Sequence, residues 1–313
     1  MKKIFIILLL LLIVLINIYN KRSIENNYKE DEINIGKEFL KSKKVAFCGL
    51  IRDGEDRLKT SLPQIEKIGS YFKDWILLIV ENDSKDNTRQ VLLDYNNQNN
   101  KVNVLGCNGI NLKSCQLNTL ATTSHSTTNY RINKMSMLRN IYLDELRKDK
   151  YNDVDYVIVW DFDLIGEVNI DGLFTTFYNL KTNNNINVVC ANGIRNIDII
   201  PFITAETVDK EIGIPLYVYY DTFAYRNFED KSNFINNKWY YDIIYSIPSD
   251  IKLKKVKSCF GGFTIYKRDA IILSSYTTYT DNNGLPICEH QGLNERINGV
   301  YHNNELLYLI YKN

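Results

Sequence analysis

The sequence predicts an α/β protein in which helices flank a mostly parallel central sheet, preceded by an N-terminal transmembrane helix. Short apolar segments alternate with segments of helical periodicity, and most of the early apolar segments end abruptly in polar residues. The chain also begins with a long apolar run. Such alternation is typical of parallel strands joined by helices. With 313 residues, of which 45% are apolar, the chain is long enough to bury a large core.

The N-terminal segment has the composition of an uncleaved signal anchor. Lys2 and Lys3 precede an apolar run, Ile4 to Tyr19, that is broken only by Asn17. As a helix this run would be about 24 Å long, slightly shorter than a hydrocarbon core of about 30 Å. No small residues typical of a cleavage site follow it, although a cleaved signal peptide is the alternative. We therefore expect residues 1–20 to anchor a single-pass, type II membrane protein of the secretory pathway.

A charged segment without a clear apolar stripe follows the anchor. We expect residues 21–43 to form a stem and residues 44–313 to form one catalytic domain. Lys and Arg number 38 against 37 Asp and Glu, so no strong field would draw the chain to nucleic acid.

The six cysteines lack the paired spacing of a zinc site. Some could form disulfides in an oxidising compartment, where Cys107 and Cys115 would close a short loop. Otherwise Cys48 and Cys190, which lie in strand-like runs, fit the role of small buried apolar residues. The sequon Asn82-Asp83-Ser84 falls in a predicted ligand-binding loop, where a glycan would block the site.

The elements follow one another in a regular order through the first half of the chain. We expect strands at 45–51, 75–83, 101–107, 155–163, 186–194 and 258–268. We expect helices at 57–72, 87–98, 131–149 and 268–275. Residues 108–130 and 196–256 have the composition of loops, and residues 287–311 that of a tail.

The strongest functional signal is the segment YVIVWDFDLIG at residues 156–166. A strand that is apolar on both faces lies inside a sheet, so its end delivers Asp161 and Asp163 to the rim where ligands bind. Residues at i and i+2 of a strand point to the same side, with Phe162 facing away. Two such carboxylates suit Mg²⁺ or Mn²⁺ with positions left open for substrate phosphates. Another Mg²⁺-phosphate chemistry and an exposed acidic strand end are the alternatives.

Two earlier strands also end in polar loops at the same predicted rim. The segment VENDSKDNT offers Glu81 and Asp83 to a ribose or a base, and a solvated turn before a helix is the alternative. The segment LIRDGED adds Arg52 and Asp53, of which Arg52 could pair with a phosphate.

The helix at 131–149 carries basic residues close to the same rim. Arg131, Lys134 and Arg139 are reasonable partners for a diphosphate, whereas charges on a solvated helix face are the alternative, above all for Lys134.

Taken together, these segments resemble the nucleotide-binding half of GT-A-fold glycosyltransferases over about residues 44–165. The resemblance implies that Asp83 contacts the base or ribose, and that Asp161 and Asp163 hold the diphosphate of a nucleotide sugar through Mn²⁺ or Mg²⁺. The segment Asn82-Asp83-Ser84 lacks the glycine of the family-2 pattern, so the chain departs from that family.

The adjacent pair Glu289-His290 forms a second candidate centre. GT-A enzymes, which the chain resembles, commonly use a late His as a further metal ligand and a late acid as the base that deprotonates the acceptor hydroxyl. The resemblance thus implies His290 as a metal ligand, with His302 as a rival, and Glu289 as a catalytic residue beside Asp163. A helix-start Glu next to a buried His is the alternative.

Three short motifs look like the fungal capsule-associated α-1,3-mannosyltransferase family and its relatives. They are YDTFAYR at 220–226, CFGGFTIYKRDA at 259–270 and CEH at 288–290. This resemblance implies a GDP-mannose donor, with Tyr220, Asp221 and Arg226 on the acceptor side.

We therefore expect a metal-dependent glycosyltransferase of the hexosyltransferase class. It would move a sugar, mannose by the resemblance, from GDP-mannose or a UDP-sugar to a hydroxyl of a glycan or glycoconjugate. A sugar nucleotidyltransferase is one alternative, although LIRDGEDR is a poor version of its Gly-rich phosphate loop. A membrane-tethered, inactive carbohydrate-binding protein is the other, and the presence of both Asp161 and Asp163 argues against it.

Overall fold

The computed structural model describes residues 28–106, 129–199, 214–228, 252–281, 284 and 286–311. The predicted anchor at residues 1–20 lies outside this part, as does most of the predicted loop at 108–130. Among the helices that the structure describes, none is both long enough and apolar enough to span a bilayer.

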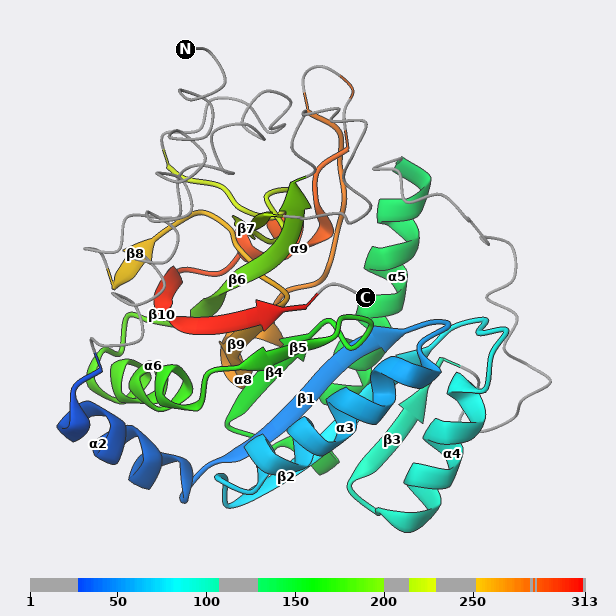
Figure 1. Ribbon diagram of the computed structural model, residues 1–313, viewed down its shortest axis with the longest axis horizontal. Coiled ribbons are helices and arrows are strands. Elements are labelled where there is room, and N and C mark those ends of the chain that lie inside the picture. Colours follow the sequence, from blue (N-terminus) through cyan, green and yellow to red (C-terminus); the bar gives the residue numbers. More distant parts are fainter. Residues whose placement is uncertain are drawn as a thin grey trace, which may run out of the picture.

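The first half of the chain forms the predicted parallel sheet. Strands β3, β2, β1 and β4 lie side by side in that order, and each pair of neighbours runs parallel (Figure 1). Every residue of β4 is buried, as expected for a central strand. In chain order the elements are β1 (Lys44–Ile51), α3 (Glu55–Gly69), β2 (Asp74–Glu81), α4 (Thr88–Gln98), β3 (Val102–Leu105), α5 (Asn129–Leu146), η3 (Asp149–Tyr151) and β4 (Tyr156–Trp160).

The second half departs from the prediction, because the sheet there is mixed rather than mostly parallel. Strand β9 runs antiparallel to β4 on one side and to β6 on the other. Strand β10 then pairs parallel with β6 and antiparallel with β5 and β8. Apolar periodicity shows that a strand exists but does not show its direction. The strands are β5 (Gly166–Val168), β6 (Val188–Ile199), β7 (Ile214–Tyr219), β8 (Leu253–Lys255), β9 (Phe263–Lys267) and β10 (Val300–Ile310).

Strand β10 lies where the sequence predicts a tail. Its polar run, His302 to Glu305, hides the strand pattern, yet all four residues are buried. The pairing with β6 shifts register between Asn303 and Leu307 at the end of this run. A bulge of this kind disrupts the ladder locally and changes the direction of the side chains around it. Asn303, for example, donates from Nδ2 to Thr176 Oγ1 at 2.9 Å.

Helices cover both faces of the sheet and close two apolar cores. Residues of α3, α4 and α6 pack in one core, and residues of α5 and α9 pack in the other. Helix α6 (Ile170–Thr182) begins at Asn169, whose side chain accepts a hydrogen bond from Gly172 N, as in an ordinary N-cap. The remaining helices are α8 (Arg268–Ile271) and α9 (Glu289–Asn294).

The predicted stem at 21–43 contains a helix, α2 (Glu30–Leu40), that belongs to the folded domain. Helix α2 packs on α6 so closely that a Cβ added to Gly36 would lie 1.9 Å from the Phe174 carbonyl oxygen. Tyr28, just before it, donates its hydroxyl to the Glu305 carbonyl at 2.8 Å. The closest contact is made by a glycine, which has no side chain to contribute to an apolar stripe, so the sequence pattern does not reveal this packing. The folded part therefore begins well before residue 44.

The structure pairs one of the cysteines that the sequence suggests are buried apolar residues. Cys190 of β6 forms a disulfide with Cys259, which precedes β9, and both are fully buried. Cys48 and Cys288 are buried and free. Of the two alternatives that the sequence left open, Cys48 is a buried free thiol and Cys190 is a buried disulfide cysteine, because the strand order brings it beside a partner 69 residues away.

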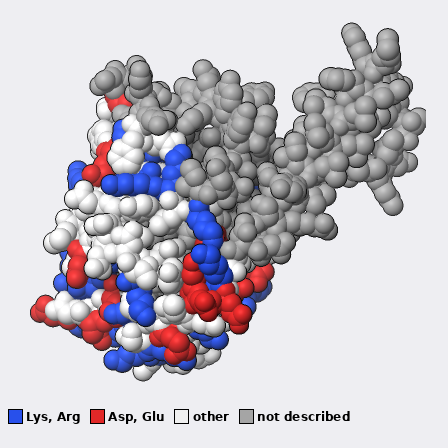
Figure 2. All heavy atoms as spheres, turned by 90° about the vertical axis from the view of Figure 1, so that its left-hand side faces the viewer, with Lys and Arg blue, Asp and Glu red and all other residues white. Residues whose placement is uncertain are grey.

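Charges of both signs are mixed on the surface. On the face shown in Figure 2, Lys and Arg lie among Asp and Glu over the described residues. Several of these charges form ion pairs one helical turn apart, such as Lys41 with Glu38. Exposed pairs of this kind contribute little to stability, typically below about 1 kcal/mol each.

Replacing Gly36 by Ala tests whether α2 is part of the folded domain. We expect Gly36→Ala to lower the free energy of unfolding by about 1–3 kcal/mol, because the methyl group would clash with the α6 backbone. In a free stem the same change would favour a helix by about 1 kcal/mol. Denaturant unfolding measures the difference. Asn34→Ala, on the exposed face of α2, is the matched control, and equal stability of the two variants would contradict the packing.

Candidate active site

A pocket of about 740 Å³ opens at the carboxyl ends of β1, β2 and β4. This is the rim at which ligands bind in α/β sheets. Helix α5, the loop at 220–223, Phe260 and the start of α9 complete its wall. The pocket brings together most of the residues that the sequence predicts for the site, among them Arg52, Asp53, Arg131, Arg139, Asp161, Asp163, Glu289 and His290.

Asp161 and Asp163 follow β4 directly, as predicted. The backbone of Asp161 is fixed by a hydrogen bond from its N–H to the Gly262 carbonyl at 3.0 Å. Its Oδ1 accepts from Arg139 Nη2 at 3.2 Å and its Oδ2 accepts from the Tyr220 hydroxyl at 3.1 Å. Burial raises the pKa of Asp161 to about 7, and the nearby Asp163 adds to the rise while Arg139 opposes it. Phe162, between the two acids, is fully buried.

Arg139 is a buried cation that joins the two predicted centres. Besides Asp161, it contacts Glu289, to which its Nε donates at 3.1 Å. The guanidinium lies 5.3 Å from the Phe260 ring centre and 5.8 Å from that of Tyr276. Its Nη1 is buried and has no hydrogen-bond partner in the part of the chain that the structure describes. Arg139 therefore partly neutralises both acids and keeps one donor for a ligand.

Glu289 and His290 begin α9 and are almost fully buried. The His290 ring stacks on Phe260 with ring centres 3.8 Å apart. Neither of its ring nitrogens has a hydrogen-bond partner among the described residues. Burial lowers the pKa of His290 well below its usual value, and Arg139 lowers it further, so the imidazole is neutral. A neutral imidazole is the form that binds a metal ion.

The acids of the pocket fit a divalent cation in part. No group of three or more His, Cys, Asp or Glu side chains is arranged to hold a metal ion within the described ranges. Mg²⁺, however, is commonly held by one or two carboxylates together with waters and substrate phosphates. Asp161 and Asp163 supply two such carboxylates at the pocket wall. The pair fits the ion, and His290 as a third ligand stays a prediction.

Basic side chains also line the pocket. Lys134 is only 8% exposed, so the alternative of a solvated surface charge is wrong for this residue. Its Nζ lies 4.0 Å from Asp83 Oδ2, and burial lowers its pKa. Two further basic residues, Arg57 and Lys85, line the pocket although the sequence did not single them out. Lys85 lies inside the segment VENDSKDNT, and Arg57 directly follows the segment LIRDGED, so their positions in these polar segments were the available signal.

The loop after β2 differs from the prediction, because neither Glu81 nor Asp83 lines the pocket. Glu81 is fully buried and accepts from Ser84 N and Arg89 Nε, each at 2.8 Å, so it holds the loop together. Asp83 accepts from Asn82 Nδ2 in a left-handed backbone conformation. Asn82 does line the pocket, and its buried Oδ1 has no hydrogen-bond partner among the described residues. The sequence thus predicts Glu81 and Asp83 as ligand contacts, whereas Asn82 between them is the residue that lines the pocket.

The residues implied for the acceptor side are only partly brought together. Tyr220 and Asp221 line the pocket, whereas Arg226 is buried outside it and donates to the backbone carbonyls of Thr222 and Tyr225. The rival metal ligand His302 does not line the pocket either. It is fully buried, and aromatic rings pack edge-on around it.

Comparison with known proteins places this site within a family. The family model described as Cryptococcal mannosyltransferase 1 matches residues 56–291. No curated protein matches the sequence.

Several solved structures resemble the chain with low identity. TarS from S. aureus, residues 1–349, aligns with a TM-score of 0.42 and 14% identity over 86% of this chain and 60% of its own. PcManGT, a mannosyltransferase from Pyrobaculum calidifontis solved with GDP-Man and Mn²⁺, gives 0.45 and 9% over 96% and 68%. A mycobacterial protein gives 0.42 and 10% over 90% and 72%. The chain thus spans 60% of the TarS structure.

The family match extends from α3 to α9 and covers more than half of the chain. The matched range includes Asp161 and Asp163, Arg139 and the Glu289-His290 pair. The chain therefore belongs to the family of cryptococcal mannosyltransferase 1, a family of glycosyltransferases.

Proposed function

We propose that this protein is a metal-dependent glycosyltransferase that moves a sugar, mannose by its family, from a nucleoside-diphosphate sugar to a hydroxyl of a glycan or glycoconjugate. The observation that carries the proposal is the position of Asp161 and Asp163. Both acids stand at the end of a buried strand, in a pocket that several Arg and Lys side chains also line. Carboxylates and cations that line one pocket suit a ligand that carries both phosphates and a metal ion.

The basic residues that line the pocket are proposed to bind the donor phosphates. Arg52, Arg131 and Lys134 come from two different elements and converge on one pocket. Asp161 and Asp163 would hold Mn²⁺ or Mg²⁺, which when bound offsets negative charge on the departing diphosphate. Arg139 Nη1 is a further donor, since its other nitrogens are engaged by Asp161 and Glu289.

Glu289 is the proposed catalytic base, and the loop at 220–223 is proposed to border the acceptor. Glu289 lines the pocket and its Oε1 accepts from Arg139, which fixes the direction of the carboxylate. Tyr220, Asp221 and Phe223 lie along the same wall. Asp221 adopts a left-handed backbone with φ of 68°, a strained conformation that is common at ligand sites.

Family membership favours a transferase over the nucleotidyltransferase that the sequence left open. The family description names mannose, so GDP-mannose is the first donor to test and UDP-sugars are the second. An inactive carbohydrate-binding protein would bind a sugar without cleaving a donor, and the same assay separates it.

We further propose that residues 1–20 anchor the protein in a membrane of the secretory pathway. The apolar run itself supports an anchor. The disulfide between Cys190 and Cys259 supports an oxidising compartment for the domain. Asn82, the sequon residue, is 4% exposed and lines the pocket, so the folded site has no room for a glycan there.

Removing the charge of Asp161 or Asp163 tests the proposed metal and diphosphate site. We expect Asp161→Asn and Asp163→Asn each to lower Mn²⁺-dependent hydrolysis of GDP-mannose by about 100-fold or more. Both should also lose the rise in Tm that Mn²⁺ with GDP gives the wild type. Asp171→Asn, an exposed acid at the start of α6, is the control. A wild-type protein that neither hydrolyses nor binds any nucleotide sugar would end the transferase proposal.

Asp221 should make the ligand-free protein less stable as the pH rises. Burial, and then the charge of Glu289, raises its pKa from 3.8 to about 7. The unfolded chain therefore releases this proton first, and stability falls between about pH 4 and pH 7. We expect Asp221→Asn to raise Tm by several degrees at pH 8 and hardly at all at pH 4, relative to wild type at each pH. Equal shifts at both pH values would contradict the burial of this charge.

Removing the apolar run tests the anchor. We expect full-length protein to stay with membranes after a carbonate wash, because the run buries its side chains in lipid. Residues 28–313 should be soluble without detergent and unfold at the same temperature as the detergent-solubilised full-length protein. Release of the full-length protein by carbonate would contradict the anchor.

A further inference from the structure

Phe260 touches two residues of the site with one aromatic ring. The ring stacks on the His290 imidazole with centres 3.8 Å apart and planes 16° apart. The Arg139 guanidinium carbon lies 5.3 Å from the same ring centre. All three side chains are nearly inaccessible to solvent, with exposures of 1%, 2% and 3% for Phe260, His290 and Arg139.

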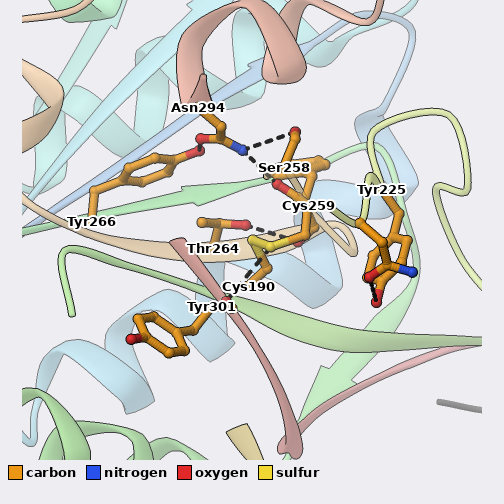
Figure 3. Close-up of a disulfide and its surroundings, with 10 residues drawn as sticks. Cys190, Tyr225, Ser258, Cys259, Thr264, Tyr266, Asn294 and Tyr301 are labelled. Carbon is orange, nitrogen blue, oxygen red and sulfur yellow. Dashed lines mark hydrogen bonds between the residues drawn. A yellow bond between two sulfur atoms is a disulfide. The ribbon is translucent and has the colours of Figure 1, made fainter. Parts of the chain in front are cut away.

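The backbone that carries this ring is held from several sides. Its neighbour Cys259 is joined to β6 by the disulfide with Cys190 (Figure 3). Asn294 of α9 donates from Nδ2 to the Cys259 carbonyl at 2.8 Å and to Ser258 Oγ at 3.2 Å (Figure 3). Thr264 Oγ1 donates to the Phe260 carbonyl at 2.8 Å. The ring therefore projects from a segment that can shift little.

The turn that follows the ring packs directly on β6. Gly261 adopts a φ of 64°, and a Cβ there would lie 2.1 Å from the Ala191 carbonyl oxygen. Gly262 accepts from Asp161 N. The segment 259–262 thus contacts Asp161 through its backbone, and its Phe260 ring contacts Arg139 and His290.

A second ring faces the same two residues. Tyr276 lies edge-on to His290, with centres 5.5 Å apart, and 5.8 Å from the Arg139 guanidinium carbon. The Asn140 side chain accepts from the Tyr276 N–H through Oδ1 and donates from Nδ2 to the Tyr276 carbonyl. Tyr142 donates its hydroxyl to that of Tyr276 at 2.7 Å. Arg139 and His290 therefore lie against two fixed aromatic rings.

Ring contacts matter here because His290 lacks the usual means of orientation. A metal-binding His normally donates its second nitrogen to a carboxylate or carbonyl, which fixes the plane of the ring. Neither nitrogen of His290 has such a partner among the described residues. Stacking on Phe260 is thus the contact that defines the imidazole plane, and the cation–π contact restrains the neighbouring guanidinium.

We propose that Phe260 is a positioning residue, whose ring orients His290 and Arg139 toward the pocket and whose place is fixed by the Cys190–Cys259 disulfide. This inference rests on the proposed function for its consequence in ligand binding. It rests on contacts alone for its structural part.

Phe260→Leu removes the flat ring while keeping most of the apolar volume. We expect the variant to bind Mn²⁺ with GDP about tenfold more weakly than wild type, as measured by titration calorimetry on the full-length protein. Phe177→Leu, a fully buried Phe of α6 that packs on Phe72 and Tyr156, is the matched control and should keep wild-type affinity. Equal affinity of the two variants would overturn the proposal. Phe260→Met supplies a second variant without a ring if the first does not fold.

The imidazole proton resonances test the contact without any ligand. A ring stacked at 3.8 Å shifts the His290 protons upfield, and Phe260→Leu should remove the shift while Phe177→Leu keeps it. Unchanged His290 resonances in Phe260→Leu would overturn the positioning role. If the wild type bound neither Mn²⁺ nor GDP, the proposed function would fail instead, and these resonances alone would decide the role of Phe260.

A double-mutant cycle tests the part of the disulfide. The paired change Cys190→Ala with Cys259→Ala should weaken binding in the wild-type background by about as much as Phe260→Leu does. Combined with Phe260→Leu it should add little, because both changes act through one ring. Fully additive losses would show that the disulfide does not act through Phe260.

Discussion

The site depends on one buried cation, the guanidinium of Arg139, placed between Asp161 and Glu289. Removing one member of a buried charge pair typically costs about 3–5 kcal/mol, because the other charge is left without compensation. The three residues come from α5, the end of β4 and the start of α9, which are far apart in the chain. Arg139 thus holds together the two centres that the sequence could present only as separate motifs, and the rings of Phe260 and Tyr276 enclose it.

Much of the first half of the fold follows from sequence pattern alone. Apolar runs of strand length alternate with helical periodicity from β1 to β4, and a parallel arrangement is the ordinary outcome of such alternation. The carboxyl ends of these strands share one rim, so Arg52, Asp53, Asp161 and Asp163 meet in one pocket as expected. The pairs β1–β2 and β2–β3 join consecutive strands, and β4 then takes the free edge of β1.

The rest could not be predicted because it depends on contacts between distant segments. Strand β9 enters the sheet antiparallel between β4 and β6, and no periodicity encodes that direction. Helix α2 docks through Gly36, which a search for apolar residues overlooks. In the loop after β2, only the three-dimensional turn decides that Asn82 faces the pocket while Glu81 binds Arg89. The family resemblance found Tyr220 and Asp221, which no pattern in the chain would have linked to the pocket.

The central place of β10 has a consequence for the order in which the chain folds during synthesis. The parallel strands β3, β2, β1 and β4 can pair with one another once residue 160 has left the ribosome, because β4, the last of the four in the chain, ends there. Strand β6 pairs with β7 over Ile194–Ile199, but its first residues must wait for β9 and then for β10. Until those two strands have been made, the edges of these first residues stay exposed, and unpaired edges invite wrong association. The half of the molecule that carries Glu289 and His290 is thus completed later than the half that carries Asp161 and Asp163.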